Sequence, residues 1–339
     1  MKREIPAIVW PLAALAALCV FNLAANPGFF HVTVMNGHLF GSLVDILNRA
    51  APVLLLSCGM TLVIATGGID LSVGAVMAVC GAVAACLIAR PAGSPLAVFD
   101  IHGSALLACG AAVGVGMVLG LFNGLLVAKA NVQPIVATLI LMVAGRGIAQ
   151  LLTSGQIVIF DHPQFNSIGA GFSLGLPNPI WIASISFLLA FVLVRATPFG
   201  VLVSACGDNP VAARYCGIDI VRIRTIVYVL SGLLAACAGI IATSDIKAAD
   251  ANNVGQYLEL DAILAVAIGG GSLTGGRFSL FGSFVGAVLM QSLTTTLLAR
   301  GTPPEVTLIL KAVVVICVCI LQSGALSVRL QKRDRQAAG

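Results

Sequence analysis

The sequence has few charged residues. Only 9% of its 339 residues are Asp, Glu, Lys or Arg, whereas 59% are hydrophobic. An ordinary soluble domain carries roughly 25% charged residues, so this chain could bury a core but could not cover one. Its net charge of +5 is spread along the chain, without a basic block of the kind that binds nucleic acid. We therefore expect one transmembrane domain, residues 1–339, with lipid as its solvent and no nucleic-acid partner.

The chain also lacks the motifs of nucleotide-hydrolysing and metal enzymes. No Lys follows a Gly anywhere, so a P-loop GxxxxGK[ST] is absent. HExxH is absent too, and the ten cysteines are scattered without the spacing of a metal or disulfide site. We therefore predict no catalytic residues, no metal site and no cofactor bound by this chain. An integral membrane enzyme is the weakest function class.

Apolar runs of spanning length recur along the whole sequence. They predict an all-α, polytopic transmembrane helical bundle of about ten spans, some broken or partial. The first is too long for a signal peptide, whose apolar core has about 7–15 residues, and the eighth is too short for a simple crossing. The spans lie at roughly Ile5–Ala25, Ala50–Thr66, Ser72–Ala89, Gly103–Ala128, Pro134–Leu152, Pro179–Val194, Thr225–Thr243, Leu260–Gly270, Ser279–Leu298 and Val306–Gln322.

The distribution of Lys and Arg sets the orientation. With a cytoplasmic amino terminus and alternating spans, twelve of them fall inside and four outside, as the positive-inside rule requires. Both termini then lie in the cytoplasm. Residues 195–224 form the longest internal loop, and residues 153–178 form an external loop without Lys or Arg.

The stretch TGGIDLSVG, residues 66–74, puts an acidic residue between two apolar runs. An Asp at the centre of a spanning helix costs about 2.5–3.5 kcal/mol on insertion scales. Gly67 and Gly68 break the helix just before Asp70, and Asp70 and Ser72 can cap the next one. Two compatible alternatives stay open, a tight capped turn and a broken helix that lines a watery path. A similar stretch, Gly269–Gly276, indicates either duplicated halves or chance in a Gly-rich chain.

Further polar side chains fall within or beside the apolar spans. Arg146 is expected to face the bundle interior and to pair with a carboxylate such as Asp70. Lys311 is expected to snorkel to the outer surface, while Glu259 and Asp261 either complement a helix N-terminus or line an outer mouth. The candidates for the translocation path or its gate are Gly67, Gly68, Asp70, Ser72, Asn123, Thr138 and Arg146. Those for an external mouth are Asp250, Asn252 and Asn253.

A short helix is predicted within the internal loop, in the stretch GDNPVAARYCGID. Asp208 and Asn209 suit the N-cap, Pro210 suits the first helical position, and Gly217 suits the stop. Two turns are too few to be stable alone, and small side chains leave one face open. The helix is either a docking element or a plain amphipathic connector. The candidate coupling residues are Asp208, Asn209, Pro210, Ala212, Ala213, Arg214, Gly217 and Asp219.

These stretches give the sequence a family resemblance. TGGIDLSVG, GLFNGLLVA, QPIVATLILMVAGRG and GDNPVAARYCGI resemble the permease subunits of bacterial sugar ABC importers of the ribose/galactose type. The resemblance runs through nearly the whole chain. Its long matches, such as MTLVIATGGIDLSVGAVMA, are most similar to galactofuranose importer permeases.

The resemblance implies partners and a location. The pore would be built from two permease subunits in the bacterial inner membrane, the second being a different, paralogous chain. An ABC ATPase subunit would bind ATP and Mg²⁺ in the cytoplasm, and a periplasmic sugar-binding protein would deliver the sugar. In this family an EAA-type loop docks into the ATPase. Here Ala212, Ala213 and Gly217 match its AAxxxG core, while Val211 stands in place of the usual Glu.

The predicted function is therefore that of a transmembrane permease subunit in an ATP-driven importer of galactofuranose or a related monosaccharide. Hydrogen-bonding groups and water, more than net charge, suit the passage of a neutral polyol. The alternative is an ion-coupled secondary transporter or channel for a small polar solute. That alternative predicts uptake driven by an ion gradient with no ATPase partner.

Overall fold

The computed structural model describes residues 8–25, 28–35, 37–91, 93–98 and 104–322. Helices dominate these ranges, which agrees with the predicted all-α class. The helices are α1 (Val9–Ala25), α2 (Ser42–Ala65), α3 (Val73–Ala89), α4 (Ala105–Ala128), α5 (Pro134–Leu152), α6 (Pro163–Ala170), α7 (Asn178–Ala196), α8 (Phe199–Asp208), α9 (Pro210–Tyr215), α10 (Ile220–Ile246), α11 (Leu258–Ile268), α12 (Leu280–Ala299), α13 (Pro304–Gln322) and the 3₁₀ helix η1 (Pro95–Val98).

Short antiparallel strand pairs lie between the helices. The pairs are β1 (Thr33–Met35) with β2 (His38–Phe40), β3 (Val158–Ile159) with β6 (Ala248–Ala249), and β4 (Phe172–Ser173) with β5 (Leu176–Pro177). The pairing of β3 with β6 joins the segment after α5 to the segment after α10. The β3–β6 pair therefore joins connections that are far apart in the sequence, whereas the other two pairs are local hairpins.

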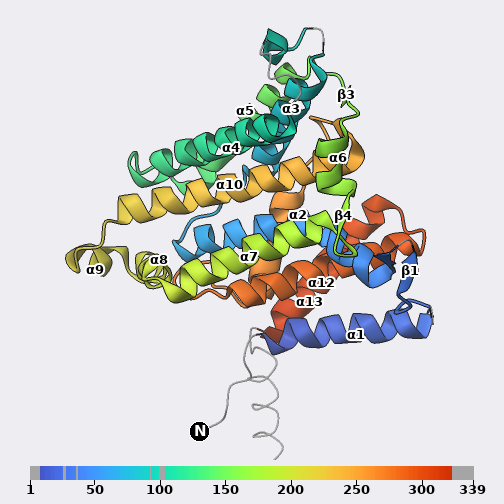
Figure 1. The fold of residues 1–339 in the computed structure, drawn as a ribbon. Coiled ribbons are helices and arrows are strands. Elements are labelled where there is room, and N and C mark those ends of the chain that lie inside the picture. Colours follow the sequence, from blue (N-terminus) through green and yellow to red (C-terminus); the bar gives the residue numbers. More distant parts are fainter. Residues whose placement is uncertain (1–7, 26–27, 36, 92, 99–103, 323–339) are drawn as a thin grey trace, which may run out of the picture.

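Helix α10 is central to the bundle. In Figure 1 the long helices run side by side across the view, from α4 through α10 and α2 to α12 and α1. Nearly every residue of α3 is buried, as are most residues of α2. The apolar windows of α4, α5 and α7 are instead only 28%, 28% and 11% buried. The core thus lies around α2, α3 and α10, and α4, α5 and α7 keep wide bare apolar faces.

Small residues allow α4 and α10 to pack closely. Gly116, Gly120 and Gly124 follow one another at every fourth position of α4 and face α10. A side chain at Gly120 would collide with the carbonyl of Tyr228, and a Cβ on Gly124 would lie 2.9 Å from the Cα of Thr225. Within lipid, where apolar burial does not drive helices together, such close contact of backbones holds the pair.

Each of the ten predicted spans contains a helix, with some changes of boundary. Six helices of the described chain are long and apolar enough to cross a membrane: α2, α4, α5, α7, α10 and α12. The others are α1, α3, α11 and α13, so the number of complete crossings stays a prediction. Helix α2 begins at Ser42, eight residues before the predicted Ala50, because its first turns contain the charged residues Asp45 and Arg49 and are still helical.

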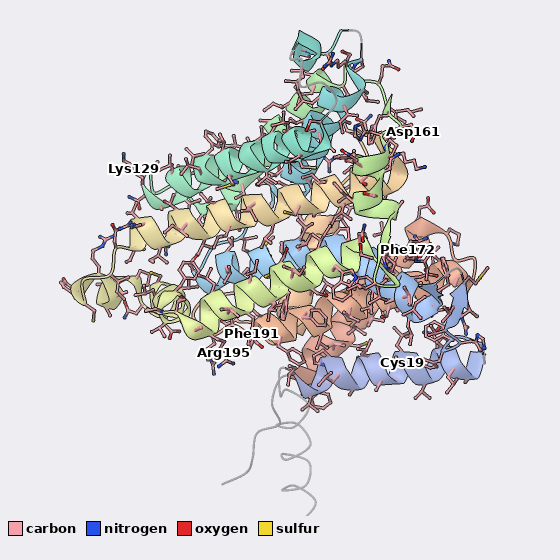
Figure 2. All side chains as sticks on the ribbon, viewed as in Figure 1. Cys19, Lys129, Asp161, Phe172, Phe191 and Arg195 are labelled. Carbon is pink, nitrogen blue, oxygen red and sulfur yellow. The ribbon has the colours of Figure 1, made fainter. Side chains whose placement is uncertain are left out.

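The two predicted long loops lie at opposite ends of the bundle. Figure 2 shows Lys129 and Arg195 at one end and Asp161 and Phe172 at the other. Residues 195–224 are folded into α8 and α9 at the first end, while residues 153–178 form β3, α6 and the β4–β5 hairpin. The terminal segments predicted to be cytoplasmic, residues 1–7 and 323–339, lie outside the described residues.

One stretch, residues 171–175, has the G-x-S-x-G spacing of a hydrolase nucleophile elbow. That elbow requires a sharp turn from a strand into a helix. Here the stretch forms the β4–β5 hairpin, with Leu174 and Gly175 at φ values of 53° and 82° in its turn. The carbonyl of Ser173 accepts a hydrogen bond from the Trp181 indole at 2.9 Å. The spacing therefore belongs to a two-residue hairpin turn.

Candidate functional site

Asp70 is held by three hydrogen bonds inside the bundle. It lies between α2 and α3, beyond Gly67, whose φ is 79°. Its carboxylate accepts from the Ser72 amide at 3.0 Å, from the Ser72 hydroxyl at 2.6 Å and from the Ser231 hydroxyl of α10 at 2.9 Å. Asp70 is only 2% exposed. The protein thus supplies the donors that a buried carboxylate needs.

Ser72 is the N-cap residue of α3, and its side chain extends this network to α4. Asn123 donates to the Ser72 hydroxyl at 2.8 Å. That hydroxyl itself donates to Asp70 and accepts no hydrogen bond from the α3 backbone. Ser72 therefore occupies the predicted N-cap position of α3, but its side chain does not make the capping bond. Asp70, Ser72 and Asn123 are all buried in this conformation. A role in lining an open path stays a prediction.

Arg146 faces the chain segment that enters α11, and its predicted partner was wrong. Its Nη1 donates to the carbonyls of Ala251 at 3.0 Å and Val254 at 2.6 Å, and more weakly to that of Asn252 at 3.4 Å. Asp70 is instead satisfied by serines. The carbonyls are exposed to Arg146 because the backbone between β6 and α11 is not helical. Backbone of this kind needs a donor from elsewhere in the protein.

Helix α5 therefore contacts both segments in which the helical backbone is broken, the one between α2 and α3 and the one between β6 and α11. We call these the interrupted segments. One turn from its start, the Thr138 hydroxyl donates to the Ile69 carbonyl at 3.2 Å, beside Asp70. Two turns later Arg146 holds residues 251–254, and Gln150 donates to the Asn252 side chain at 2.7 Å. The predicted path residues of α5 thus bind the two segments where the helical backbone is broken.

The predicted external-mouth residues form one tight turn. The carboxylate of Asp250 accepts from the amides of Asn252 and Asn253 at 3.0 and 3.1 Å, and from the Asn253 side chain at 2.7 Å. The hydrogen bond from the Asn253 side chain is the main cause that lowers the pKa of Asp250 below its ordinary value. Asn252 and Asn253 are exposed. The turn therefore exposes the neutral amides of Asn252 and Asn253, while the charge of Asp250 is hydrogen-bonded within the turn.

The N-termini of α3 and α11 meet inside the bundle. A side chain at Gly74 would collide with the Gly255 carbonyl and with the Glu259 carboxylate. Glu259 lies in the first turn of α11 and is 6% exposed. It therefore suits the positive end of a helix dipole and does not line an open mouth.

Lys311 is paired inside the bundle. Its Nζ lies 2.8 Å from the Asp261 carboxylate, and the two side chains are 10% and 15% exposed. The predicted snorkelling of Lys311 is therefore wrong. Because Asp261 lies in the first turn of α11, this ion pair fastens α13 to the start of that short helix.

The two glycine-rich stretches that resemble each other lie in contact at the end of the bundle that carries α9. A Cβ on Gly275 would lie 3.1 Å from the Cα of Gly67. The Gly276 amide donates to the Ala65 carbonyl at 3.0 Å, and the Ser204 hydroxyl of α8 donates to the Gly276 carbonyl at 2.9 Å. We call Ala65, Ser204, Gly207 and Gly276 the junction.

The predicted short helix forms as α9. The Asn209 side chain accepts from the Ala212 amide at 3.0 Å, and Pro210 is the first helical residue. Gly217, at a φ of 82°, ends the helix, and the Ile218 amide donates to the Ala213 carbonyl at 3.1 Å. The predicted caps at Asn209 and Gly217 are confirmed.

Two residues of the predicted coupling set differ from expectation. Asp208 is the last residue of α8 instead of a cap of α9, and its carboxylate lies against Gly276 of the junction. Ala213 faces inward and is 5% exposed, whereas Ala212 is exposed. The open face of small side chains that was predicted for α9 therefore includes Ala212 but not Ala213. Asp219 caps α10 by accepting from the Arg222 amide at 3.0 Å. Arg214 is exposed on α9.

Sequence reasoning missed several residues of this site. Ser231 holds Asp70 from 161 positions away, and Arg224 donates to the Thr66 carbonyl at 3.3 Å. Tyr228 lies beside Gly68, where a Cβ would be 2.7 Å from its hydroxyl. All three lie on α10 on the side that faces α2, and their spacing of three to four residues is the only signal that could have found them.

Comparison with known proteins identifies the family. A family model described as "Branched-chain amino acid transport system / permease component" matches residues 42–319. The chain is 52% identical to the galactofuranose transporter permease protein of Escherichia coli (strain K12), over 93% of this chain and 90% of that protein. No solved structure matches the chain.

Two further relatives match over similar lengths. The chain is 39% identical to the fructose import permease protein of Bifidobacterium longum (strain NCC 2705), over 93% of this chain and 87% of that protein. It is 36% identical to the ribose import permease protein of Escherichia coli (strain K12), over 92% of each. The six long apolar helices fit a multi-pass protein of the inner membrane. The chain therefore belongs to the permease family described as the branched-chain amino acid transport system / permease component.

Proposed function

We propose that this chain is the permease subunit of an ATP-driven importer for galactofuranose or a related monosaccharide. Its relatives are named as permeases for galactofuranose, fructose and ribose. The polar groups inside the bundle are mainly hydroxyls and amides, among them Ser72, Asn123 and Thr138. Such neutral donors and acceptors suit a polyol, whose passage needs replacement of hydrogen bonds to water more than a compensating charge.

The observation that carries this proposal is the connection of the short helix α9 to the junction through the end of α8. Helix α9 exposes Val211 and Tyr215, which are 65% and 88% exposed and line a shallow pocket of about 250 Å³ with Pro210 and Arg214. An ATPase subunit, with ATP and Mg²⁺ bound to it, would dock on this face. Asn209 is the only residue between α9 and α8, so a pull on α9 reaches Gly207 and Asp208 at the junction.

The remaining partners follow from the exposed polar groups. Gln150, Asn252 and Asn253 are exposed beside apolar helices. Each of their side-chain amides makes one hydrogen bond within the chain, and lipid would leave the remaining donors and acceptors unpaired. A second, paralogous permease subunit that encloses a watery path with this face would satisfy them. A periplasmic sugar-binding protein would meet the opposite end of the bundle from α9.

The test is reconstitution with the ATPase, the second permease and the binding protein. We expect sugar uptake to require ATP. The uptake rate of galactofuranose is compared with those of ribose and fructose. Ala212→Glu, on the exposed face of α9, should abolish co-purification of the ATPase. The matched control is Ala130→Glu, an exposed alanine after α4, which should leave the complex intact.

Two results would contradict the proposal. Uptake by the chain without any ATPase, driven by an ion gradient, would favour the ion-coupled transporter. Equal ATPase binding by Ala212→Glu and the native chain would remove α9 from the coupling surface. Ala213→Glu is unsuitable for this test because Ala213 is buried against the bundle.

A further inference from the structure

A cavity of about 660 Å³ lies at the end of the bundle that carries α8 and α9. Helix α7, helix α8 and the segment that leads into α12 form its walls. Its lining includes Phe191, Arg195, Val201, Arg277, Phe278 and Phe281. We call this the basic cavity. It is separate from the Asp70 network and from the exposed face of α9.

The charge of the basic cavity has one sign. Arg195 and Arg277 line it, and both are exposed. Among the described residues that line the cavity there is no Asp or Glu. The first turn of α12, which also lies at its wall, adds the positive end of a helix dipole. The cavity therefore attracts an anion and offers no carboxylate to compete with it.

Apart from Thr197, Ser204 and Ser279, the rest of the wall is mainly apolar, and it continues into a bare apolar surface. Phe281 and Val201 are 51% and 73% exposed at the cavity. Along the same helix as Arg195, residues Leu188, Leu189 and Val192 are 48% to 65% exposed. Arg195 itself lies over the Phe191 ring, 5.9 Å from its centroid. An occupant with an anionic head and a long apolar tail would match both parts of this surface.

The predicted orientation of the chain puts the basic cavity at the cytoplasmic end of the bundle. Figure 2 shows Arg195 and Phe191 at the same end of the bundle as Lys129 but on the opposite flank. That flank carries α7, in whose apolar window only 11% of the residues are buried. Basic cavities between transmembrane helices on the cytoplasmic side are known to bind the head groups of anionic lipids.

We propose that the basic cavity binds an anionic phospholipid of the cytoplasmic leaflet. Its phosphate would lie between Arg195 and Arg277, and its acyl chains would follow Phe281 and the exposed face of α7. Bound there, the lipid would bridge α7 and α8 to the start of α12. This site would not overlap the surface proposed for the ATPase on α9.

The test is native mass spectrometry of the purified full-length chain in detergent, titrated with phosphatidylglycerol and with phosphatidylethanolamine of the same acyl chains. We expect phosphatidylglycerol to be retained in preference to phosphatidylethanolamine. Arg195→Gln and Arg277→Gln should each weaken phosphatidylglycerol binding by about fivefold, and the double variant by about thirtyfold. Arg195→Lys and Arg277→Lys keep the charge and should retain most of the binding.

Lys129→Gln is the matched control, because Lys129 is an exposed basic residue at the same end on the other flank. The proposal is overturned if the double variant binds phosphatidylglycerol like the native chain, or if Lys129→Gln loses as much binding. Displacement of the lipid by millimolar glycerol 3-phosphate would indicate a soluble phosphate ester as the ligand and would overturn it too. So would displacement by the purified ATPase subunit, which would make the cavity a protein-docking surface.

Discussion

Gly207 offers a sharp test of the link between the cytoplasmic helices and the junction. It lies in α8, and a Cβ there would collide with the Ala65 carbonyl and the Gly276 amide. These two groups are backbone and are hydrogen-bonded to each other at 3.0 Å, so they cannot rotate away. Gly207→Ala must therefore push α8 away from the junction or break that hydrogen bond.

The expected free-energy cost of Gly207→Ala is the sum of opposing contributions. Overpacking costs about 1–3 kcal/mol, and the strained hydrogen bond costs about 0.5–1.5 kcal/mol. Replacing Gly by Ala inside a helix returns about 1 kcal/mol. The net loss of about 0.5–3.5 kcal/mol shifts the equilibrium of the closed junction by roughly 2- to 300-fold. ATP hydrolysis should continue while less sugar is imported per ATP.

The assay is the ratio of ATP hydrolysed to sugar imported in proteoliposomes, together with the thermal unfolding midpoint. Gly147→Ala is the matched control, because Gly147 is also inside a helix but faces open space. It should raise the unfolding midpoint slightly and leave the ratio unchanged. The proposed transmission through α8 is refuted if Gly207→Ala is as stable and as tightly coupled as Gly147→Ala.

Three further changes test the interior contacts. Lys311→Met leaves the Asp261 charge unpaired and should destabilise the chain by about 3–5 kcal/mol. The double variant Lys311→Met/Asp261→Leu should restore the unfolding midpoint. A midpoint that stays low in the double variant would argue against the ion pair. Tyr228→Phe removes a buried hydroxyl without a partner among the described residues and should raise the midpoint, by roughly 1 kcal/mol in free energy of unfolding; a lower midpoint would show that the hydroxyl is bonded. Arg146→Gln removes charged hydrogen bonds worth about 1.5–3 kcal/mol each. Sugar uptake should therefore fall while the ATPase still binds. Unchanged sugar uptake would show that those contacts are dispensable.

Local signals in the sequence predicted much of the fold. The caps at Asn209 and Gly217 act within four residues of the helix they bound, so their chemistry alone located α9. The apolar runs located the long helices for the same reason. The start of α2 was misplaced because Asp45 and Arg49 lower the hydropathy of turns that are still helical.

Contacts between distant segments could not be predicted in the same way. The partner of Arg146 is a set of backbone carbonyls, which carry no signature in the side-chain sequence. The partner of Asp70 is Ser231, one serine among many in the chain. Which polar group meets which depends on how α5 and α10 lie against the interrupted segments. A single sequence without relatives does not specify that arrangement.

The attachment of both interrupted segments to one helix limits how they can move. Thr138 and Arg146 are eight residues apart on α5, which separates their anchor points by roughly 12 Å along the axis. A rigid rod with two such attachments cannot shift one without shifting the other. If α5 tilts about a point between them, the segment at Asp70 and the segment at Asn252 move in opposite directions.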